Sequence, residues 1–216
     1  MLGLAEPGMR VLLSRSSNAA RKLPLSWELV EAEPHGLVGI NTALPNRLVE
    51  EALRDRRIPE LAAYDEIRRE VAYGRASRVD FLLRGDGLPD AYVEVKNVHF
   101  SRAPGLAEFP DSVTARGARH LDELADMVAA GHRAAMLYLV QRTDSERLAI
   151  CRDLDPAYGA AFDRARAAGV EMLAYRCAIS AEEIALGAAV AVEAEAAGAL
   201  DEGQGQALRR GLSQGL

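Results

Sequence analysis

Cysteine is scarce in this chain of 216 residues, which has Cys151 and Cys177 and no others. Two cysteines that stand far apart and in no C-x-x-C pattern form neither a zinc site nor a disulfide framework. No apolar run reaches the roughly 18 residues that a membrane helix needs, and the N-terminus lacks the pattern of a signal peptide. These absences predict a cytoplasmic protein with reduced thiols and no membrane association.

Excess positive charge is also missing, because the formal net charge is −6. This balance excludes a protein that coats nucleic acid through bulk charge alone. The charged fraction of 27% and the apolar fraction of 49% are those of a globular protein. A chain of this length is long enough to bury a sizeable core.

One stretch near the N-terminus, residues 7–27, departs from the overall charge balance. It contains no acid, ends at the only tryptophan, Trp27, and carries four bases. These are Arg10, Arg15, Arg21 and Lys22. The runs RVLLS and SWELVEA predict short strands on either side of a basic loop. The loop is either simply solvated, or it contacts phosphates while Trp27 stacks on a base; the sequence alone leaves both open.

The most informative stretch is residues 67–100, which predicts three successive β-strands. We expect these strands at Ile67–Tyr73, Arg78–Leu83 and Ala91–Phe100, separated by the glycine-containing turns at residue 74 and at residues 85–87. The second strand carries an acid, Asp80, between two apolar residues. The third carries Glu94 and Lys96, which share one face because side chains alternate along a strand.

If the second and third of these strands pair as a meander, Asp80 lies across from the face of Glu94 and Lys96. Two carboxylates would then converge beside an ammonium group, and hard oxygen ligands of this kind suit Mg²⁺ or Mn²⁺. The competing interpretation is a solvated hairpin face that carries a cross-strand ion pair.

The elements around this stretch predict an α/β chain with a mixed sheet. A helix is expected from about Asn46 to Arg57, with Glu51 on the flank of its apolar stripe, and a second helix from about residue 112 to Ala130. The near-continuous apolar run at residues 133–142, which ends in Gln141 and Arg142, predicts a strand buried on both faces. A third helix to about Ala168 and a strand near residues 170–180 complete the order α-β-β-β-α-β-α-β. The Ala-, Glu- and Gly-rich remainder predicts a frayed or disordered tail.

This order, with an acid on the second strand and E-x-K on the third, matches the PD-(D/E)XK nuclease-like fold. Several runs, moreover, resemble the bacterial sugar fermentation stimulation protein A (SfsA) family. They are RKLPLSWELVE, VGINTALPNRLVEEAL, IPELAAYDEIRREVAYG, SRVDFLL, YVEVKNV, AEFPDSVTARGARHLDEL and LVQR. The resemblance implies an N-terminal OB-type domain, a nuclease-like domain, and DNA binding linked to the regulation of sugar metabolism, notably of maltose.

The resemblance also implies domain bounds and site residues. It implies a partial OB-type β domain at 1–40, a PD-(D/E)XK nuclease-like domain at 41–180 and a tail at 181–216. Asp80, Glu94 and Lys96 fall on the nuclease motif, and Glu51 falls on the acid of the first helix. Gln141 falls at the end of the strand that follows the long helix. Family members begin a few dozen residues earlier, so the OB-type barrel is expected to be N-terminally truncated and incomplete.

Three functions follow from these patterns. The first is a sequence-tolerant DNA-binding protein, and the second is a metal-dependent nuclease that acts on DNA or RNA. In the third, the charges are structural and the partner is another protein. In the nuclease, Asp80 and Glu94, with Glu51, would hold the Mg²⁺ or Mn²⁺ ion, while Lys96 and Gln141 would assist the reaction. No recognition helix with a dimer seam is visible, which disfavours a helix-turn-helix regulator; the oligomeric state is left open.

Overall fold

The computed structural model describes residues 3–32, 36–74 and 77–193. The N-terminal part contains β1 (Val11–Arg15), β2 (Leu25–Ala32) and β3 (Gly36–Gly39). The elements that follow are α1 (Pro45–Arg54), the 3-10 helix η1 (Pro59–Leu61), β4 (Glu66–Tyr73), β5 (Ser77–Arg84), β6 (Ala91–Val98), β7 (Phe100–Ala103), β8 (Gly105–Phe109), α2 (Ala115–Ala129), β9 (Arg133–Val140), β10 (Ser145–Ile150), α3 (Pro156–Ala167), β11 (Glu171–Ile179), β12 (Ile184–Ala189) and β13 (Ala191–Glu193). No helix among these residues is long and apolar enough to cross a membrane.

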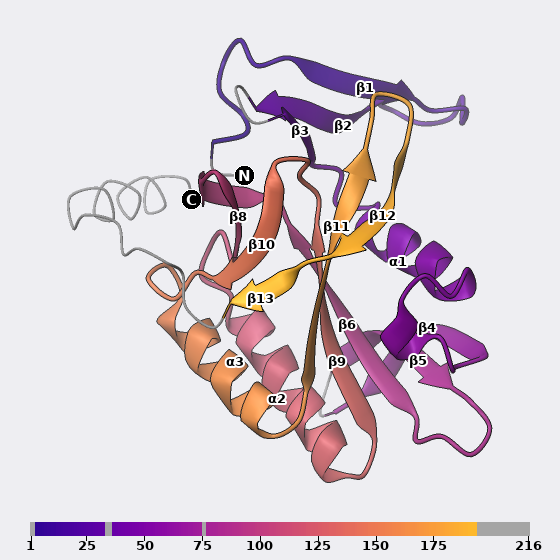
Figure 1. Ribbon diagram of the computed structural model, residues 1–216. Coiled ribbons are helices and arrows are strands. Elements are labelled where there is room, and N and C mark those ends of the chain that lie inside the picture. Colours follow the sequence, from indigo (N-terminus) through magenta and orange to yellow (C-terminus); the bar gives the residue numbers. More distant parts are fainter. Residues whose placement is uncertain (1–2, 33–35, 75–76, 194–216) are drawn as a thin grey trace.

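A six-stranded mixed sheet with the order β12-β11-β9-β6-β5-β4 forms the centre of the molecule (Figure 1). Strand β9 pairs in parallel with both β6 and β11, while β4, β5 and β6 form an antiparallel meander. The run RAAMLYLV has seven buried residues of eight, as expected for a strand covered on both faces. The three strands predicted at residues 67–100 and the mixed α/β architecture are thereby confirmed.

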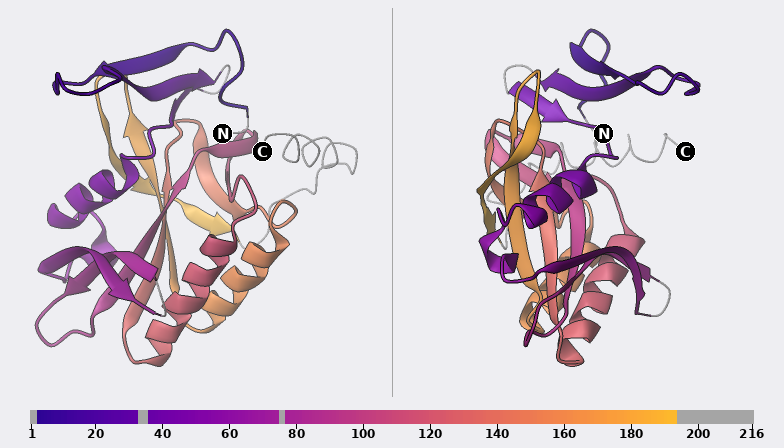
Figure 2. Two further views of the ribbon diagram at one scale, coloured as in Figure 1. Left: turned by 180° about the vertical axis from the view of Figure 1, so that it is seen from behind. Right: turned by 90° about the vertical axis from the view of Figure 1, so that its right-hand side faces the viewer.

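Different elements cover the two faces of this sheet. Helices α2 and α3 lie side by side on one face, where Leu121 and Phe162 pack with Met136 of β9 (Figures 1 and 2). A smaller sheet with the order β13-β10-β8-β7 contributes to the same core. Helix α1 packs on the opposite face, where its residue Val49 shares a core with Val93. The apolar stripe of α1 therefore turns toward the face that does not carry Glu94.

One buried carboxylate, Asp155, fixes the starts of both α2 and α3. Its Oδ1 accepts a hydrogen bond of 2.9 Å from the backbone N–H of Tyr158 and so caps α3. Its Oδ2 accepts one of 2.7 Å from the N–H of Thr114, the residue that caps α2. A single side chain thus sets how the two helices lie beside each other, and α2 is the helix that reaches the charged residues described below.

The N-terminal segment forms a three-stranded antiparallel sheet, β1-β2-β3, whose third strand was not predicted. This sheet lies at the end of the central sheet near β11 and β12 (Figure 1). Its core contains Val30 and Val38. Strand β3 joins it to the central sheet, since the N–H of Gly39 donates to the carbonyl of Gln141 and the N–H of Thr143 donates to that of Leu37.

We expect Gly39→Ala to destabilise the junction between the two sheets. A Cβ built on Gly39 would lie 2.4 Å from Oε1 of Gln141, a side chain that is fully buried. Overpacking at such a site typically costs about 1–3 kcal/mol, which urea denaturation would measure. The same substitution made together with Gln141→Ala, which removes the obstructing atoms, is the control. An equal loss of stability in both backgrounds would contradict the steric explanation.

The C-terminal region differs from its prediction as a tail that begins at residue 181. Strand β12 pairs antiparallel with β11, and β13 pairs in parallel with β10. Strands therefore continue to Glu193, and the rest of the predicted tail lies outside the described residues. Strands β8 and β10 were also missed, because each is short and pairs in parallel with a partner distant in the sequence.

Candidate functional site

Asp80 lies where β5 separates from β6. Side-chain alternation breaks at this residue, since Val79 packs with the α2 core whereas Phe81 packs with the α1 core. On the other side of β5, Glu70 of β4 has a φ of 52°, and the ladder between β5 and β6 ends at the pair Phe81–Val93. Beyond that pair, the side chain of Asp80 replaces the backbone as acceptor: its Oδ2 accepts a hydrogen bond of 2.8 Å from the N–H of Val95.

The second oxygen of Asp80 is held by α1. The side-chain amide of Asn46, in the first turn of that helix, donates to Oδ1 over 2.8 Å. Burial raises the pKa of Asp80, and the negative charge of Glu94 raises it further, while the bonds from Val95 and Asn46 act in the opposite direction. The two carboxylates are therefore close enough to oppose each other's ionisation, which is the arrangement that a bound cation would relieve.

Glu94, on β6, is buried, with 3% of its surface exposed. Its Oε1 accepts a hydrogen bond of 2.7 Å from Nζ of Lys96 and another from Nδ1 of His120. Burial acts to raise the pKa of Glu94, but the bond from His120 and the charge of Lys96 outweigh it and lower the pKa. Glu94 is therefore held as a carboxylate, with one oxygen used by the protein.

His120 is a member of this site that the sequence analysis did not assign. Its Nε2 accepts a hydrogen bond of 3.2 Å from Nε of Arg116. A ring nitrogen that accepts carries no proton, so the proton of the imidazole is on Nδ1, which donates it to Glu94. The sequence could have indicated His120 through its position, because it lies next to the apolar Leu121 on the buried face of α2.

Four buried side-chain atoms around Glu94 have no hydrogen-bond partner among the described residues. They are the hydroxyl of Tyr73, Oγ of Ser77, Oε2 of Glu94 and Oε2 of Glu123. Burial raises the pKa of Tyr73, and the negative charges of Glu94, Glu123 and Asp80 raise it further. Polar atoms that are buried without partners are costly. This interior is thus suited to water, a cation or a polar ligand.

The free Oε2 of Glu94 and the carboxylate of Asp80 are the hard oxygen donors that Mg²⁺, Mn²⁺ or Ca²⁺ prefers. The described part of the chain contains no group of three or more His, Cys, Asp or Glu side chains placed to hold a metal ion. A cation here would take its other ligands from water, backbone or substrate, as Mg²⁺ usually does. The residues fit a divalent cation on these terms.

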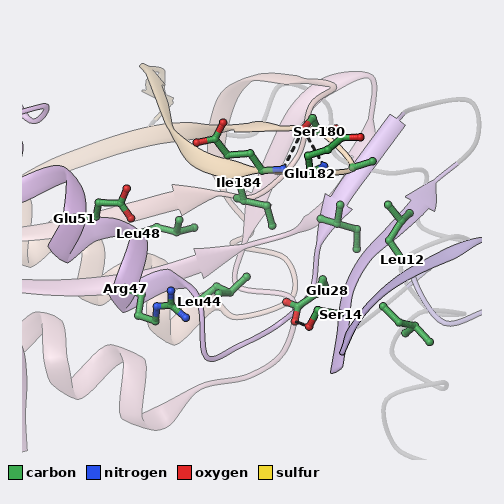
Figure 3. Close-up of a pocket in the computed structure, with 14 residues that line it drawn as sticks. Leu12, Ser14, Glu28, Leu44, Arg47, Leu48, Glu51, Ser180, Glu182 and Ile184 are labelled. Carbon is green, nitrogen blue, oxygen red and sulfur yellow. Dashed lines mark hydrogen bonds between the residues drawn. The ribbon is translucent and has the colours of Figure 1, made fainter. Parts of the chain in front are cut away.

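The structure corrects the predicted placement of Glu51. This side chain projects from α1 into a pocket of about 310 Å³ between α1, the β1–β2 hairpin and residues 180–184 (Figure 3). No metal-binding group of three is present in the described residues, so Glu51 does not complete such a group with Asp80 and Glu94. Asn46, one turn earlier, is the α1 residue that reaches the site.

Gln141 also lies away from the charged residues. Its Nε2 donates a hydrogen bond of 2.8 Å to Oδ1 of Asn97, the neighbour of Lys96 on β6. Since adjacent residues of a strand point to opposite faces, Gln141 and Lys96 are on opposite sides of the sheet. Gln141 is therefore a residue of the junction with β3 and not a neighbour of Glu94.

The basic residues of the N-terminal stretch are on the surface of the β1–β2 hairpin. Arg10 pairs with Glu31 at 3.1 Å, Arg21 donates to Ser26, and Arg15 and Lys22 are exposed. Trp27 is only partly exposed; its indole N–H donates to the carbonyl of Leu29, and its ring packs on the core of the N-terminal sheet. The four bases remain accessible to phosphates, whereas Trp27 serves largely as a packing residue.

Comparisons with known proteins place these features in a family context. A family model described as the sugar fermentation stimulation protein RE domain matches residues 43–183. A second, described as the SfsA N-terminal OB domain, matches residues 1–40. A sugar fermentation stimulation protein homolog from Agrobacterium fabrum is 56% identical over 193 residues, which are 89% of this chain and 80% of that protein. One from Dinoroseobacter shibae is 58% identical over 89% of this chain and 79% of its own.

A solved structure of Pyrococcus furiosus SfsA in complex with Ca²⁺ shares the fold of this chain. The TM-score is 0.78 and the sequence identity 25%, with 87% of this chain and 79% of that one covered.

Proposed function

The chain belongs to the SfsA family, and on that premise we propose that it binds DNA with little sequence preference and holds a divalent cation at Asp80 and Glu94. We place this activity in the cytoplasm and link it to the control of sugar utilisation, notably of maltose. An OB domain together with a restriction endonuclease-like domain supports nucleic acid as the partner. The Ca²⁺ complex of the Pyrococcus furiosus relative supports the cation.

The observation that carries the cation site is the free Oε2 of Glu94, a buried oxygen with no partner among the described residues. Beside it, Asp80 has a pKa raised first by burial and then by the charge of Glu94. Two carboxylates that repel in a buried setting gain from a cation, while Lys96 and His120 already occupy the other oxygen of Glu94. Phosphate oxygens of DNA would complete the coordination that the protein leaves open.

Each residue of the site has a distinct role toward a bound DNA backbone. A divalent cation, when bound, would neutralise phosphate charge and lower the pKa of a coordinated water. Asn46 orients Asp80, and His120 orients Glu94. Lys96 keeps its ammonium beside Glu94, where it would neutralise the negative charge on a phosphate or hold a water molecule against it.

A second candidate function is hydrolysis of the phosphodiester bond of DNA or RNA. Its specific support is Lys96, whose ammonium lies 2.7 Å from Glu94, a carboxylate of the proposed cation site. Lys96 would then stabilise charge that develops on the attacked phosphate.

The test is to incubate the purified protein with labelled single- and double-stranded DNA and RNA, with and without Mn²⁺. We expect retention of DNA that weakens with salt and strengthens with Mn²⁺. Cleavage that requires Mn²⁺ would select the nuclease. Absence of both binding and cleavage at low salt would refute the two nucleic-acid functions and leave the charges a structural role.

We further expect that replacing the four N-terminal bases by alanine weakens DNA binding and flattens its dependence on salt. Each phosphate contact that is lost should reduce the slope of log affinity against log salt by about 0.9. The changed residues are Arg10, Arg15, Arg21 and Lys22. Fluorescence titrations at several salt concentrations measure the slope. An unchanged slope would show that the β1–β2 hairpin is not part of the DNA-binding surface.

A further inference from the structure

Arg116 connects the surface of the protein to the buried carboxylate of Glu94. It is exposed on α2, and its Nε donates to Nε2 of His120, which in turn donates from Nδ1 to Glu94. Among the described residues its two Nη groups contact no hydrogen-bond acceptor. A guanidinium has five N–H donors in one plane, so it can hold His120 with one edge and a phosphate with another.

The surroundings of Arg116 suit a nucleic acid backbone. Arg119 is also exposed on α2, and its positive charge acts to lower the pKa of the Tyr73 phenol. Val113, just before the helix, is 73% exposed. Two exposed arginines beside an exposed apolar side chain form a surface for a polyanion with apolar base edges.

We propose that Arg116 binds a backbone phosphate of DNA and at the same time positions Glu94, through His120, for the divalent cation. This inference rests on the proposed function, since it assigns the DNA surface of that same site to the start of α2. The link runs entirely through hydrogen bonds: Nε of Arg116 donates to Nε2 of His120, and Nδ1 of His120, together with Lys96, holds Oε1 of Glu94, while Oε2 stays free.

The direction in which the cation affinity changes when Arg116 is removed distinguishes a positioning role from a purely electrostatic one. If Arg116 acted only as a nearby positive charge, its removal would tighten cation binding, because a repulsion would be lost. If it positions Glu94, its removal weakens cation binding, and loss of a residue that orients a metal ligand typically costs about 10–100-fold. The two roles therefore predict opposite changes.

The experiment compares Arg116→Ala, Arg116→Lys and Arg119→Ala with the parent, each checked for its fold by circular dichroism. Calorimetry gives the affinity for Ca²⁺, and titration of a labelled DNA duplex at several salt concentrations gives the salt slope. Arg116→Ala should bind Ca²⁺ about tenfold more weakly and lower the slope by about 0.9. Arg116→Lys should restore the slope but not the Ca²⁺ affinity, because an ammonium lacks the second edge. Arg119→Ala should lower the slope and tighten Ca²⁺ binding.

The parent protein decides between failure of the inference and failure of the proposed function. A parent that binds neither Ca²⁺ nor DNA refutes the proposed function itself. If the parent binds both, then unchanged or tighter Ca²⁺ binding by Arg116→Ala overturns the positioning role. An unchanged salt slope in that variant overturns the phosphate contact. Full recovery of Ca²⁺ affinity by Arg116→Lys would overturn the requirement for a guanidinium that holds His120 and a phosphate with two different edges.

Discussion

Asp80→Asn should abolish binding of divalent cations and leave the cation-free protein more stable than the parent at neutral pH. The loss of affinity should exceed the roughly 100-fold that loss of an orienting partner costs, because a ligand is removed. The fold should persist, since the new amide oxygen still accepts from the N–H of Val95. Asn46 can turn its amide to present an oxygen to the new NH₂ group. Calorimetry with Ca²⁺ and thermal denaturation measure the two effects.

The gain in stability follows from the pKa of Asp80, which burial and Glu94 raise. A group with a raised pKa binds its proton more tightly when folded, so its ionisation costs stability above the folded pKa. The advantage of Asp80→Asn should therefore be full above the folded pKa of Asp80. It should shrink as the pH falls toward the unfolded value of about 3.9. A variant that is less stable than the parent at pH 7 would show that Asp80 is a structural partner.

Glu94→Gln should have the opposite effect on stability. Removing the charge leaves the ammonium of Lys96, whose side chain is 15% exposed, without its partner, and it weakens the bond from His120. Breaking a buried ion pair in this way typically costs about 3–5 kcal/mol, which urea denaturation would measure. The pKa of Glu94 is lowered, so the stability that the pair contributes should be lost as the pH falls through the folded pKa.

The matched control for Glu94→Gln removes Lys96 as well. Glu94→Gln combined with Lys96→Met removes both charges of the pair, so that Lys96 is not left without its partner. This double variant should recover most of the lost stability, and it should bind no cation because the carboxylate of Glu94 is gone. A double variant as unstable as Glu94→Gln alone would show that His120, and not Lys96, carries the stabilisation. The two carboxylates of one cation site thus have opposite expected effects on the stability of the cation-free protein.

The sequence alone was sufficient to predict that Glu94 and Lys96 lie on the same face of β6, because the alternation of side chains along a strand is a local property. Glu94 and Lys96 share a face whatever lies around them, and β6 is regular throughout. Asp80 was predicted to lie across from them, but its direction depends on the break in alternation between Val79 and Phe81. Next to that break, Glu70 on the neighbouring strand has a φ of 52°, and no pattern within β5 predicts either feature.

The residues that the sequence misplaced depend on which face of the sheet an element covers. Glu51 and Asn46 are both on α1, and only packing decides that Asn46 reaches Asp80. Gln141 follows a strand that is apolar from Ala134 to Val140, so the sequence pattern does not show which face of the sheet Gln141 lies on. His120 was visible in the sequence, but its link to Glu94 depends on how α2 packs on β6.

The short strands β12 and β13 have a consequence for how the molecule unfolds. One residue, Val190, separates them, yet β12 belongs to the six-stranded sheet and β13 to the four-stranded one. The N–H of Val190 itself donates to the carbonyl of Ala174 on β11. A connection this short cannot stretch, so one sheet cannot open at this edge without pulling on the other. The two sheets should therefore exchange their amide hydrogens as one cooperative unit and not as two.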